Sequence, residues 1–213
     1  GKHMLRGIIL ATMSGGKILT RMYFPGELEP GRSCTLPPPQ AHHALQVLRL
    51  KRGGSVVLFN GDGAEYAAVV TEASRDHFAL DVTGRETMDR EAPFPVTLAQ
   101  AVSSGERMDY TIQKAVELGV AAIQPLEARR SVVRLSAERA ERRLAHWQAV
   151  AIAACEQCGR NRVPRVLPLI PLDEFLASRA AHRDGEWRVL LSPRSARGLR
   201  DLERPAGAIV ILA

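Results

Sequence analysis

The sequence has no long apolar run and few cysteines. None of its hydrophobic stretches approaches the roughly 20 residues that cross a bilayer, so no membrane-spanning helix is predicted. Three cysteines, Cys34, Cys155 and Cys158, make an odd number, and no secretory hydrophobic segment precedes them. Disulfide frameworks of secreted proteins use cysteines in pairs, so a reducing compartment is expected. We therefore predict a cytoplasmic protein with no membrane partner.

Common catalytic signatures are also missing. The sequence contains neither the Gly-x-Ser-x-Gly turn of many hydrolases nor the His-Glu-x-x-His pair of zinc proteases. Residues 14–17 lack the spacing of a phosphate-binding loop, and the glycines within 61–63 are followed by Tyr66 where a dinucleotide loop needs its third glycine. Cys155 and Cys158 have metal-ligand spacing, but no second pair completes a tetrahedral site. Hydrolase, kinase and zinc-enzyme interpretations lose support, no metal is expected, and both cysteines are predicted to be small core residues.

What the sequence does have is positive charge concentrated in one stretch. Its 213 residues are 46% hydrophobic and carry 29 Lys and Arg against 23 Asp and Glu, giving a net charge of +6. Nine of the arginines but only three acidic residues lie between Arg129 and Arg165, which leaves the remainder neutral. Guanidinium groups grip phosphate oxygens in pairs, so this cluster favours a nucleic-acid partner over a merely solvated helix face. Aromatic residues make up only 5%, which argues against a dedicated single-strand binder that stacks bases.

The first half of the chain has the pattern of a small β-barrel. Residues 1–20 are interpreted as a tag or leader that is expected to be disordered, because the first four residues look like an expression-tag remnant. Apolar runs over 55–59 and 65–71 flank Asn-Gly-Asp-Gly, which is a hairpin signal because both dipeptides accept positive φ. We predict an antiparallel barrel as the first domain, residues 21–90.

Two local features of this domain are also predicted. A short helix over 40–49 interrupts the strands, and the prolines at 37–39 indicate an extended connection before it. The charged, proline-flanked segment 84–95 lacks apolar periodicity and is predicted to be the linker.

The second half alternates apolar runs with helical patterns. Helices are predicted over 106–118, 136–158 and 172–181. Strands are predicted over 96–102, 121–126, 166–170, 188–192 and 208–213. Strands that alternate with helices of this length imply a parallel sheet covered on both faces. The second domain, residues 91–213, is therefore predicted to be α/β.

Polar residues at the ends of the predicted helices are candidates for chemistry. Glu156 and Arg160 fall at the end of the arginine-bearing helix, where an α/β domain places its ligand crevice if this end lies on the carboxyl side of the strands. The same two residues fit an ordinary i,i+4 surface pair, and Lys114 with Glu117 fits another. The residue pattern alone leaves these alternatives open.

A resemblance to a known family bears on this choice. The segments that carry it are His43–Arg49, Gly53-Gly54, Met108–Val120, Ile123–Pro125, Arg130-Ser131, Trp147 and Cys155–Pro164. In order and spacing they resemble the signatures of the bacterial 16S ribosomal RNA uridine-N3 methyltransferases, the RsmE-like branch of the SPOUT class. The likeness covers roughly residues 21 to 213.

The resemblance implies a fold, an activity and partners. The expected fold is a PUA-like RNA-binding barrel followed by a SPOUT α/β domain that forms a homodimer. The implied reaction is methyl transfer from S-adenosyl-L-methionine to N3 of a uridine in 16S rRNA of the small ribosomal subunit. Arg160 is then expected to stabilise the developing uridine anion, with Glu156 orienting it or acting as a base.

Binding residues follow from the same resemblance. For RNA phosphates the candidates are Arg49, Lys51, Arg52, Lys114, Arg129 and Arg130. For the cofactor they are Leu191, Ser192, Pro193, Leu212 and Ala213. Family members continue beyond the last apolar strand into a Gly-Pro-Glu-Gly-Gly loop, a helix and a second loop, whereas this sequence ends at Ala213. The C-terminal trefoil-knot segment is thus expected to be absent, and these 213 residues are expected to bind the cofactor poorly.

Three alternatives remain open. Another SPOUT methyltransferase that acts on tRNA fits the same motifs, and a non-catalytic RNA-binding or ribosome-assembly factor fits the basic surface. A metabolic α/β enzyme with a small phosphorylated substrate also fits the arginines, although it would lack a steep salt dependence of RNA binding.

Overall fold

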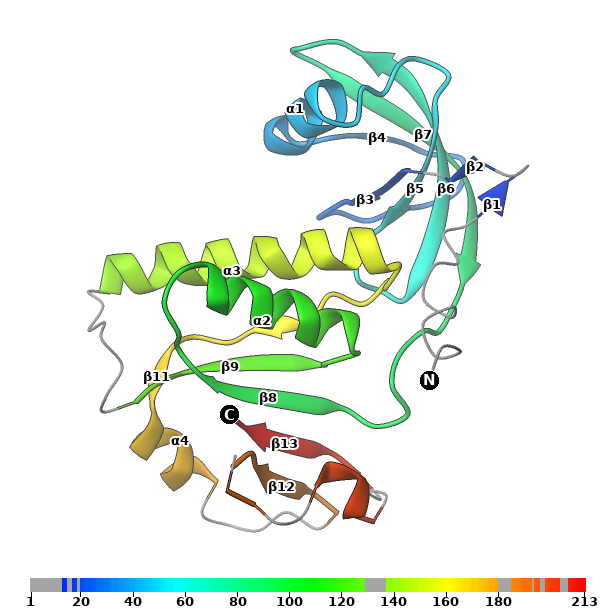
Figure 1. Cartoon of the computed structure of the whole chain (residues 1–213). Coiled ribbons are helices and arrows are strands. Elements are labelled where there is room, and N and C mark those ends of the chain that lie inside the picture. The colour runs from blue at the N-terminus through cyan, green and yellow to red at the C-terminus, as the bar shows by residue number, and fades with distance from the viewer. Residues whose placement is uncertain are drawn as a thin grey trace. The chain divides into compact units, whose positions relative to one another are not determined.

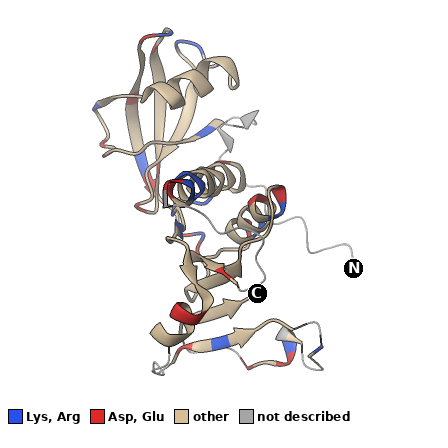
Figure 2. Ribbon diagram, turned by 90° about the vertical axis from the view of Figure 1, so that its left-hand side faces the viewer, with Lys and Arg blue, Asp and Glu red and all other residues tan. Residues whose placement is uncertain are grey.

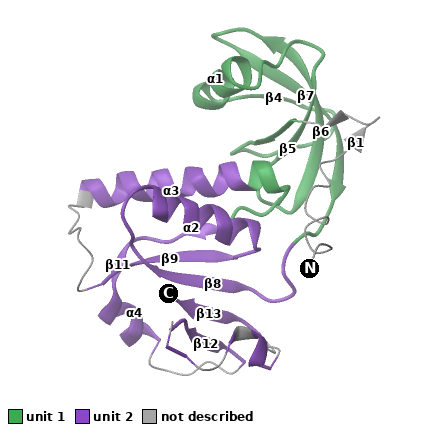
Figure 3. Ribbon diagram, viewed as in Figure 1, with its two compact units in different colours: residues 1–90, 155–163 green, residues 91–154, 164–213 purple. Residues whose placement is uncertain are grey.

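The computed structural model describes residues 13–14, 17–18, 20–128, 137–179, 185–192, 194–195, 198–203 and 207–213 (Figure 1). The chain forms two compact units (Figure 3). Unit 1 contains residues 1–90 and 155–163, and unit 2 contains residues 91–154 and 164–213. The sequence interpretation placed 155–163 in the second domain, whereas these residues lie with the first. Most of the predicted leader lies outside the described residues.

A five-stranded sheet in the order β3-β5-β6-β7-β4 forms the body of unit 1. Its strands are β3 (Thr20–Tyr23), β4 (Ser33–Thr35), β5 (Ser55–Phe59), β6 (Ala64–Ala73) and β7 (Phe78–Thr87). Two short strands before it, β1 (Met13–Ser14) and β2 (Lys17–Ile18), pair antiparallel with each other. The predicted hairpin joins β5 to β6, and Gly61 and Gly63 in its turn both have a φ of 96°, which side chains disfavour.

The sheet of unit 1 is mixed, where the sequence predicted antiparallel pairing throughout. β3 runs parallel to β5, while the β5–β6, β6–β7 and β4–β7 pairs are antiparallel. The chain between β3 and β5 includes β4 and a helix, and this provides the long crossover that a parallel pair needs. β7 continues to Thr87, so the segment predicted as a linker from residue 84 begins as a strand that pairs with β6.

Helix α1 (Pro38–Gln46) contributes Ala41 and Ala44 to the core of unit 1. The helix starts inside the proline run that was predicted to be an extended connection. Prolines are tolerated in the first helical turn because the N–H groups there have no partner within the helix. The helix therefore begins two residues before the predicted start at residue 40.

Unit 2 contains a wholly parallel sheet, as predicted, in the order β10-β9-β8-β13-β12 with β11 also beside β9. Its strands are β8 (Val96–Ala101), β9 (Ala122–Glu127), β10 (Arg165–Val166), β11 (Ile170–Pro171), β12 (Trp187–Leu190) and β13 (Ile209–Leu212). The run predicted as one strand over 166–170 is thus two short strands.

A proline explains that interruption. The carbonyl of Ile123 accepts a hydrogen bond from the N–H of Leu167 at 2.8 Å. The backbone N–H and C=O groups of odd-numbered residues in β9 therefore point toward β10 and β11. Pro125 also faces that side and has no N–H to donate, so the ladder stops there. The side-chain amide of Gln124 donates to the carbonyl of Pro168 at 2.7 Å, so this carbonyl has a partner although the ladder is interrupted.

Helices cover both faces of the sheet. α2 (Glu106–Glu117) and α3 (Ala137–Cys158) lie on one face and α4 (Leu172–Ser178) on the other, and a short 3-10 turn, η1 (Leu199–Asp201), precedes β13 (Figure 1). The predicted apolar stripe of α2 is buried at Met108, Ile112 and Val116. On the opposite face, Phe175 of α4 packs with the side chains of Ala99, Leu126 and Val210.

Truncation of Phe175 should test this second face. We expect Phe175→Ala to lower the free energy of unfolding by about 3–5 kcal/mol, because it removes a buried aromatic side chain and leaves a cavity. Leu176→Ala is the matched control. Leu176 is the next residue in α4 and is 49% exposed, so its truncation should change the free energy of unfolding by less than about 1 kcal/mol. Urea unfolding checks both variants, and equal losses would contradict the packing.

Candidate functional site

The candidate site is the segment Cys155–Val163, which comprises the last turn of α3 and the loop after it. This segment is part of unit 1 together with the barrel strands (Figure 3). Gly159 ends the helix with a φ of 87°, and its N–H donates to the carbonyl of Cys155 at 3.0 Å. A glycine in this conformation is the usual helix stop because it has no Cβ to clash. The loop therefore turns sharply just before Arg160.

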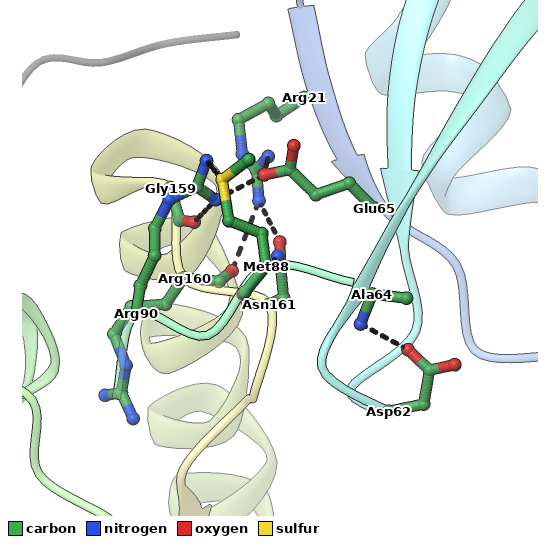
Figure 4. A network of polar contacts seen from close by, with 9 residues as sticks. All are labelled: Arg21, Asp62, Ala64, Glu65, Met88, Arg90, Gly159, Arg160 and Asn161. Carbon is green, nitrogen blue, oxygen red and sulfur yellow. Dashed lines mark hydrogen bonds and ion pairs between the residues drawn. The ribbon is translucent and has the colours of Figure 1, made fainter. Parts of the chain in front are cut away.

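A buried ion pair from the sheet meets this loop (Figure 4). Nη1 of Arg21 on β3 lies 2.5 Å from Oε1 of Glu65 on β6, and the two side chains are only 5% and 4% exposed. The Arg21 guanidinium also donates to the side-chain oxygen of Asn161 at 2.7 Å and to the carbonyl of Arg160 at 3.3 Å. It lies over the ring of Phe59, 5.1 Å from the centroid. Four different groups thus fix the orientation of one arginine.

A second arginine completes the network. Arg90 donates to the same carboxylate oxygen of Glu65 and, at 2.7 Å, to the carbonyl of Gly159. The last turn of α3 has no basic residue of its own, although the negative end of a helix dipole favours a cation. Arg90 and Arg21, from elsewhere in unit 1, donate to the carbonyls of the first two residues after this helix, Gly159 and Arg160. We call Arg21, Glu65, Arg90 and Asn161 the arginine clamp.

The electrostatics of the arginine clamp favour the ionised pair. Burial is the largest influence on the pKa of Glu65 and raises it, but the hydrogen bonds and charges of Arg90 and Arg21 outweigh burial, so the pKa is lowered. Burial lowers the pKa of Arg21, and Glu65 offsets part of this effect. Glu65 therefore remains a carboxylate at neutral pH.

Glu156 is in a different environment. Burial raises its pKa, opposed by the N–H of Tyr23, which donates to the carboxylate at 2.9 Å, and by the charges of His43 and Arg21. Tyr23 belongs to the edge strand β3, so Glu156 satisfies a backbone donor that no neighbouring strand reaches. The i,i+4 surface pair with Arg160 that the sequence allowed is not among the contacts of Glu156 in the described part of the chain.

Arg160 is buried, with only 4% of its surface exposed. Its backbone carbonyl accepts from Arg21, so the sheet fixes the main chain at this residue. Two positions on, Arg162 is exposed, and its guanidinium approaches Gly63 so closely that a Cβ there would lie 2.9 Å from a guanidinium nitrogen. The loop after α3 thus contacts the sheet at several points.

The residues predicted to bind a cofactor lie in unit 2 at the carboxyl ends of adjacent strands. Leu191 follows β12 and donates its N–H to the carbonyl of Leu212 at 2.9 Å. Ala213 follows β13 and accepts from the N–H of Ala101 at the end of β8, also at 2.9 Å. Ser192 adjoins Leu191, and Pro193 lies outside the described residues. Parallel α/β sheets bind ligands at this edge.

The described residues among those predicted to bind RNA belong to both units. Arg49, Lys51 and Arg52 are exposed together in unit 1 between α1 and β5. Lys114 lies in unit 2 and pairs with Glu117 at 2.8 Å, as the surface-pair alternative predicted. Arg129 and Arg130 lie outside the described residues. Charges of both signs lie along α3, which includes the Arg142–Glu138 pair (Figure 2).

The sequence interpretation missed the arginine clamp. Arg21 and Glu65 lie within strands of unit 1 at positions that would normally be taken as solvent-facing polar residues. One signal was present: both occupy otherwise apolar runs, and a charge at such a position needs a partner of opposite sign. The sequence could not indicate that the partners of Arg21 include a backbone carbonyl 139 residues away.

Comparison with known proteins agrees with this architecture. Residues 90–213 match the family described as an RNA methyltransferase domain, and residues 36–83 match an RNA methyltransferase PUA domain. The ribosomal RNA small subunit methyltransferase E of Neisseria gonorrhoeae, solved with bound S-adenosyl methionine, is 41% identical, with a TM-score of 0.84. That match covers 91% of this chain and 78% of the other. The chain belongs to the ribosomal RNA small subunit methyltransferase E family.

Two further relatives are similar over comparable lengths. The putative methyltransferase Lpg2936 of Legionella pneumophila, solved in complex with the bound cofactor SAM, is 34% identical with a TM-score of 0.84, covering 91% of this chain and 78% of that one. Ribosomal RNA small subunit methyltransferase E of Buchnera aphidicola is 26% identical over 95% of this chain and 79% of its own length. The predicted family and fold class, a PUA-like domain with a SPOUT-type α/β domain, are confirmed.

No helix in the described residues is both long and apolar enough to cross a membrane. Within the same residues, no three His, Cys, Asp or Glu side chains gather as metal ligands would. Cys155 is buried, as predicted for a small core residue, and Cys158 is partly exposed.

Neutralising Glu65 should destabilise the protein in a pH-dependent way. We expect Glu65→Gln to lower the free energy of unfolding at pH 7 by about 3 kcal/mol, because two arginines lose their counter-charge. The pKa of Glu65 is depressed, so its contribution is full above the unfolded-state value of about 4.3 and is lost as the pH falls through the folded-state value. The difference between wild type and variant should therefore shrink below about pH 4.

Denaturant unfolding at several pH values measures this effect. Glu138→Gln is the matched control, because its ion pair with Arg142 is exposed and should contribute less than about 1 kcal/mol. A Glu65→Gln loss that stays constant with pH would show that charge pairing does not cause the destabilisation.

Proposed function

We propose that this protein methylates N3 of a uridine in 16S rRNA of the small ribosomal subunit, with S-adenosyl-L-methionine as the methyl donor. The observation that carries the proposal is the likeness to the cofactor-bound Neisseria gonorrhoeae enzyme over nine tenths of the chain. The parallel sheet supports it, since the carboxyl ends of β8, β12 and β13 meet at one edge. Cytoplasmic location and a homodimeric state belong to the same proposal.

The two predicted domains have different roles in this proposal. Residues 21–90 form the RNA-binding domain, with Arg49, Lys51 and Arg52 on phosphates. Residues 91–213 form the methyltransferase domain, with Leu191, Ser192, Leu212 and Ala213 beside the cofactor, and its segment 155–163, which carries Glu156 and Arg160, lies in unit 1. Lys114 is proposed as a further phosphate ligand, and it must break its ion pair with Glu117 to bind a phosphate.

The reaction needs a base and a positive charge near the uridine. N3 carries an imide proton and becomes a good nucleophile when that proton is removed or the anion is stabilised. Burial raises the pKa of Glu156, which makes its carboxylate a stronger base than an exposed one. In our proposal Glu156 accepts the N3 proton and Arg160 stabilises the anion. The methyl group of a sulfonium donor already carries a good leaving group, the neutral thioether, so the protein supplies alignment and desolvation.

The carboxamide variant of Glu156 separates stability from chemistry. Glutamine keeps an oxygen for the Tyr23 N–H but cannot accept a proton, so kcat should fall by about 100-fold or more. The pKa of Glu156 is raised, so ionising it costs stability as the pH rises above about 4, and Glu156→Gln should be as stable as wild type or more stable at pH 7. Steady-state kinetics with thermal unfolding check both expectations, and unchanged kcat would remove Glu156 from the mechanism.

Removal of basic residues tests the RNA surface. The double variant Lys51→Gln/Arg52→Gln should have a shallower negative slope of log affinity against log salt concentration. The magnitude of the slope should fall by about 0.7–0.9 for each phosphate that the variant no longer neutralises. Arg75→Gln is the control, because Arg75 is also exposed in unit 1 but lies in the β6–β7 turn, away from these residues in sequence. Filter binding to 16S rRNA over a range of salt concentrations measures the slopes. Equal slopes for both variants would contradict the assignment.

Mapping the modified nucleotide tests the reaction itself. The full gene product that contains this sequence is incubated with undermethylated small subunits and isotope-labelled S-adenosyl-L-methionine, and the digested RNA is analysed by mass spectrometry. Label in N3-methyluridine of 16S rRNA is the expected result. Label in tRNA, or RNA binding without any label, would instead support the two alternative functions that the sequence left open.

A further inference from the structure

The loop that carries Arg160 begins at a glycine. Gly159 has a φ of 87°, and glycine occupies many other conformations almost as easily. Contacts from outside the loop restrict the main chain at this point. Arg21 and Arg90 make such contacts, with the carbonyls of Arg160 and Gly159 respectively.

Both contacts depend on one carboxylate. The same oxygen of Glu65 binds Arg21 and Arg90, and these two guanidiniums would repel each other without it. Glu65 is thus connected to residues 159–161 through the two arginines (Figure 4). Asn161 extends the connection, because its amide donates to the carbonyl of Met88 at 3.4 Å while its oxygen accepts from Arg21.

We propose that Glu65 is a positioning residue for methyl transfer, which acts through Arg21 and Arg90 to fix the backbone of residues 159–161 and hence the side chain of Arg160. The inference rests on the proposed function, in which Arg160 stabilises the uridine anion. A displacement of about 1 Å at a reacting group can lower a rate by roughly 100-fold. A clamp that acts on the main chain beside Arg160 therefore influences the rate without touching either substrate.

A second polar cluster on the same hairpin provides the comparison. Asp62 accepts from the N–H of Ala64 at 2.7 Å and from the hydroxyl of Tyr66 at 2.6 Å, and it lies 3.7 Å from Arg85. All of these partners lie within the β5–β7 region of the sheet, and none belongs to the loop after α3. Asp62→Asn therefore removes a comparable charge from unit 1 without releasing Arg160.

Kinetics of single and double variants test the proposal. The full gene product is prepared as wild type, Glu65→Gln, Asp62→Asn, Arg160→Lys and Glu65→Gln/Arg160→Lys. The kcat and both KM values are measured at a temperature at which circular dichroism shows every variant folded. We expect Glu65→Gln to lower kcat by about 10- to 100-fold and to leave both KM values within about twofold. Asp62→Asn should leave kcat within about twofold of wild type.

The double variant distinguishes positioning from general destabilisation. If Glu65 acts through Arg160, adding Glu65→Gln to Arg160→Lys should lower kcat by less than about twofold further. Multiplicative losses, or a Glu65→Gln variant with unchanged kcat, would overturn the inference while leaving the proposed function intact. A wild-type protein that methylates no RNA would overturn both. If Glu65→Gln does not fold, Arg90→Lys carries the same test, because lysine keeps the charge but cannot reach Glu65 and Gly159 in the same geometry.

Discussion

The hydrogen bonds from two arginines to the carbonyls of the loop after α3 are the interaction on which the site depends. Arg90 donates to the carbonyl of Gly159 and Arg21 donates to that of Arg160, whereas the last turn of α3 has no basic side chain of its own. Glu65 balances the charge of both arginines. The end of α3 and the loop after it consequently belong to the same compact unit as the barrel strands.

This arrangement gives two glutamates opposite properties. Two arginines hold the pKa of Glu65 low despite burial, so its role is to be a permanent anion. Burial holds the pKa of Glu156 high, and its contacts are a backbone N–H with more distant positive charges. In the proposed function, Glu65 gives structural support and Glu156 accepts a proton, and their pKa values are shifted in the opposite directions that these two roles require.

Much of the fold followed from local patterns, and the site did not. The turn at residues 60–63 was predictable because its glycines permit the positive φ that a hairpin turn requires. The alternation of strands and helices after residue 91 predicted the parallel sheet, but not the break at Pro125, which depends on the direction in which that residue faces a neighbouring strand. The parallel pairing of β3 with β5 is equally a tertiary property. Arg21 binds Arg160 and Asn161, which follow it in the chain by 139 and 140 residues. No local sequence pattern encodes contacts at such a separation.

Native-state hydrogen exchange measures whether Glu65 holds the loop after α3 against the strands of unit 1. Amide exchange is compared between wild type and Glu65→Gln under conditions in which both are folded. We expect the variant to have a lower opening free energy for residues 156–161 and for β3 and β6, with little change in α2, β8 and β9 of unit 2. Unchanged exchange at residues 156–161, or an equal decrease throughout both units, would contradict this expectation.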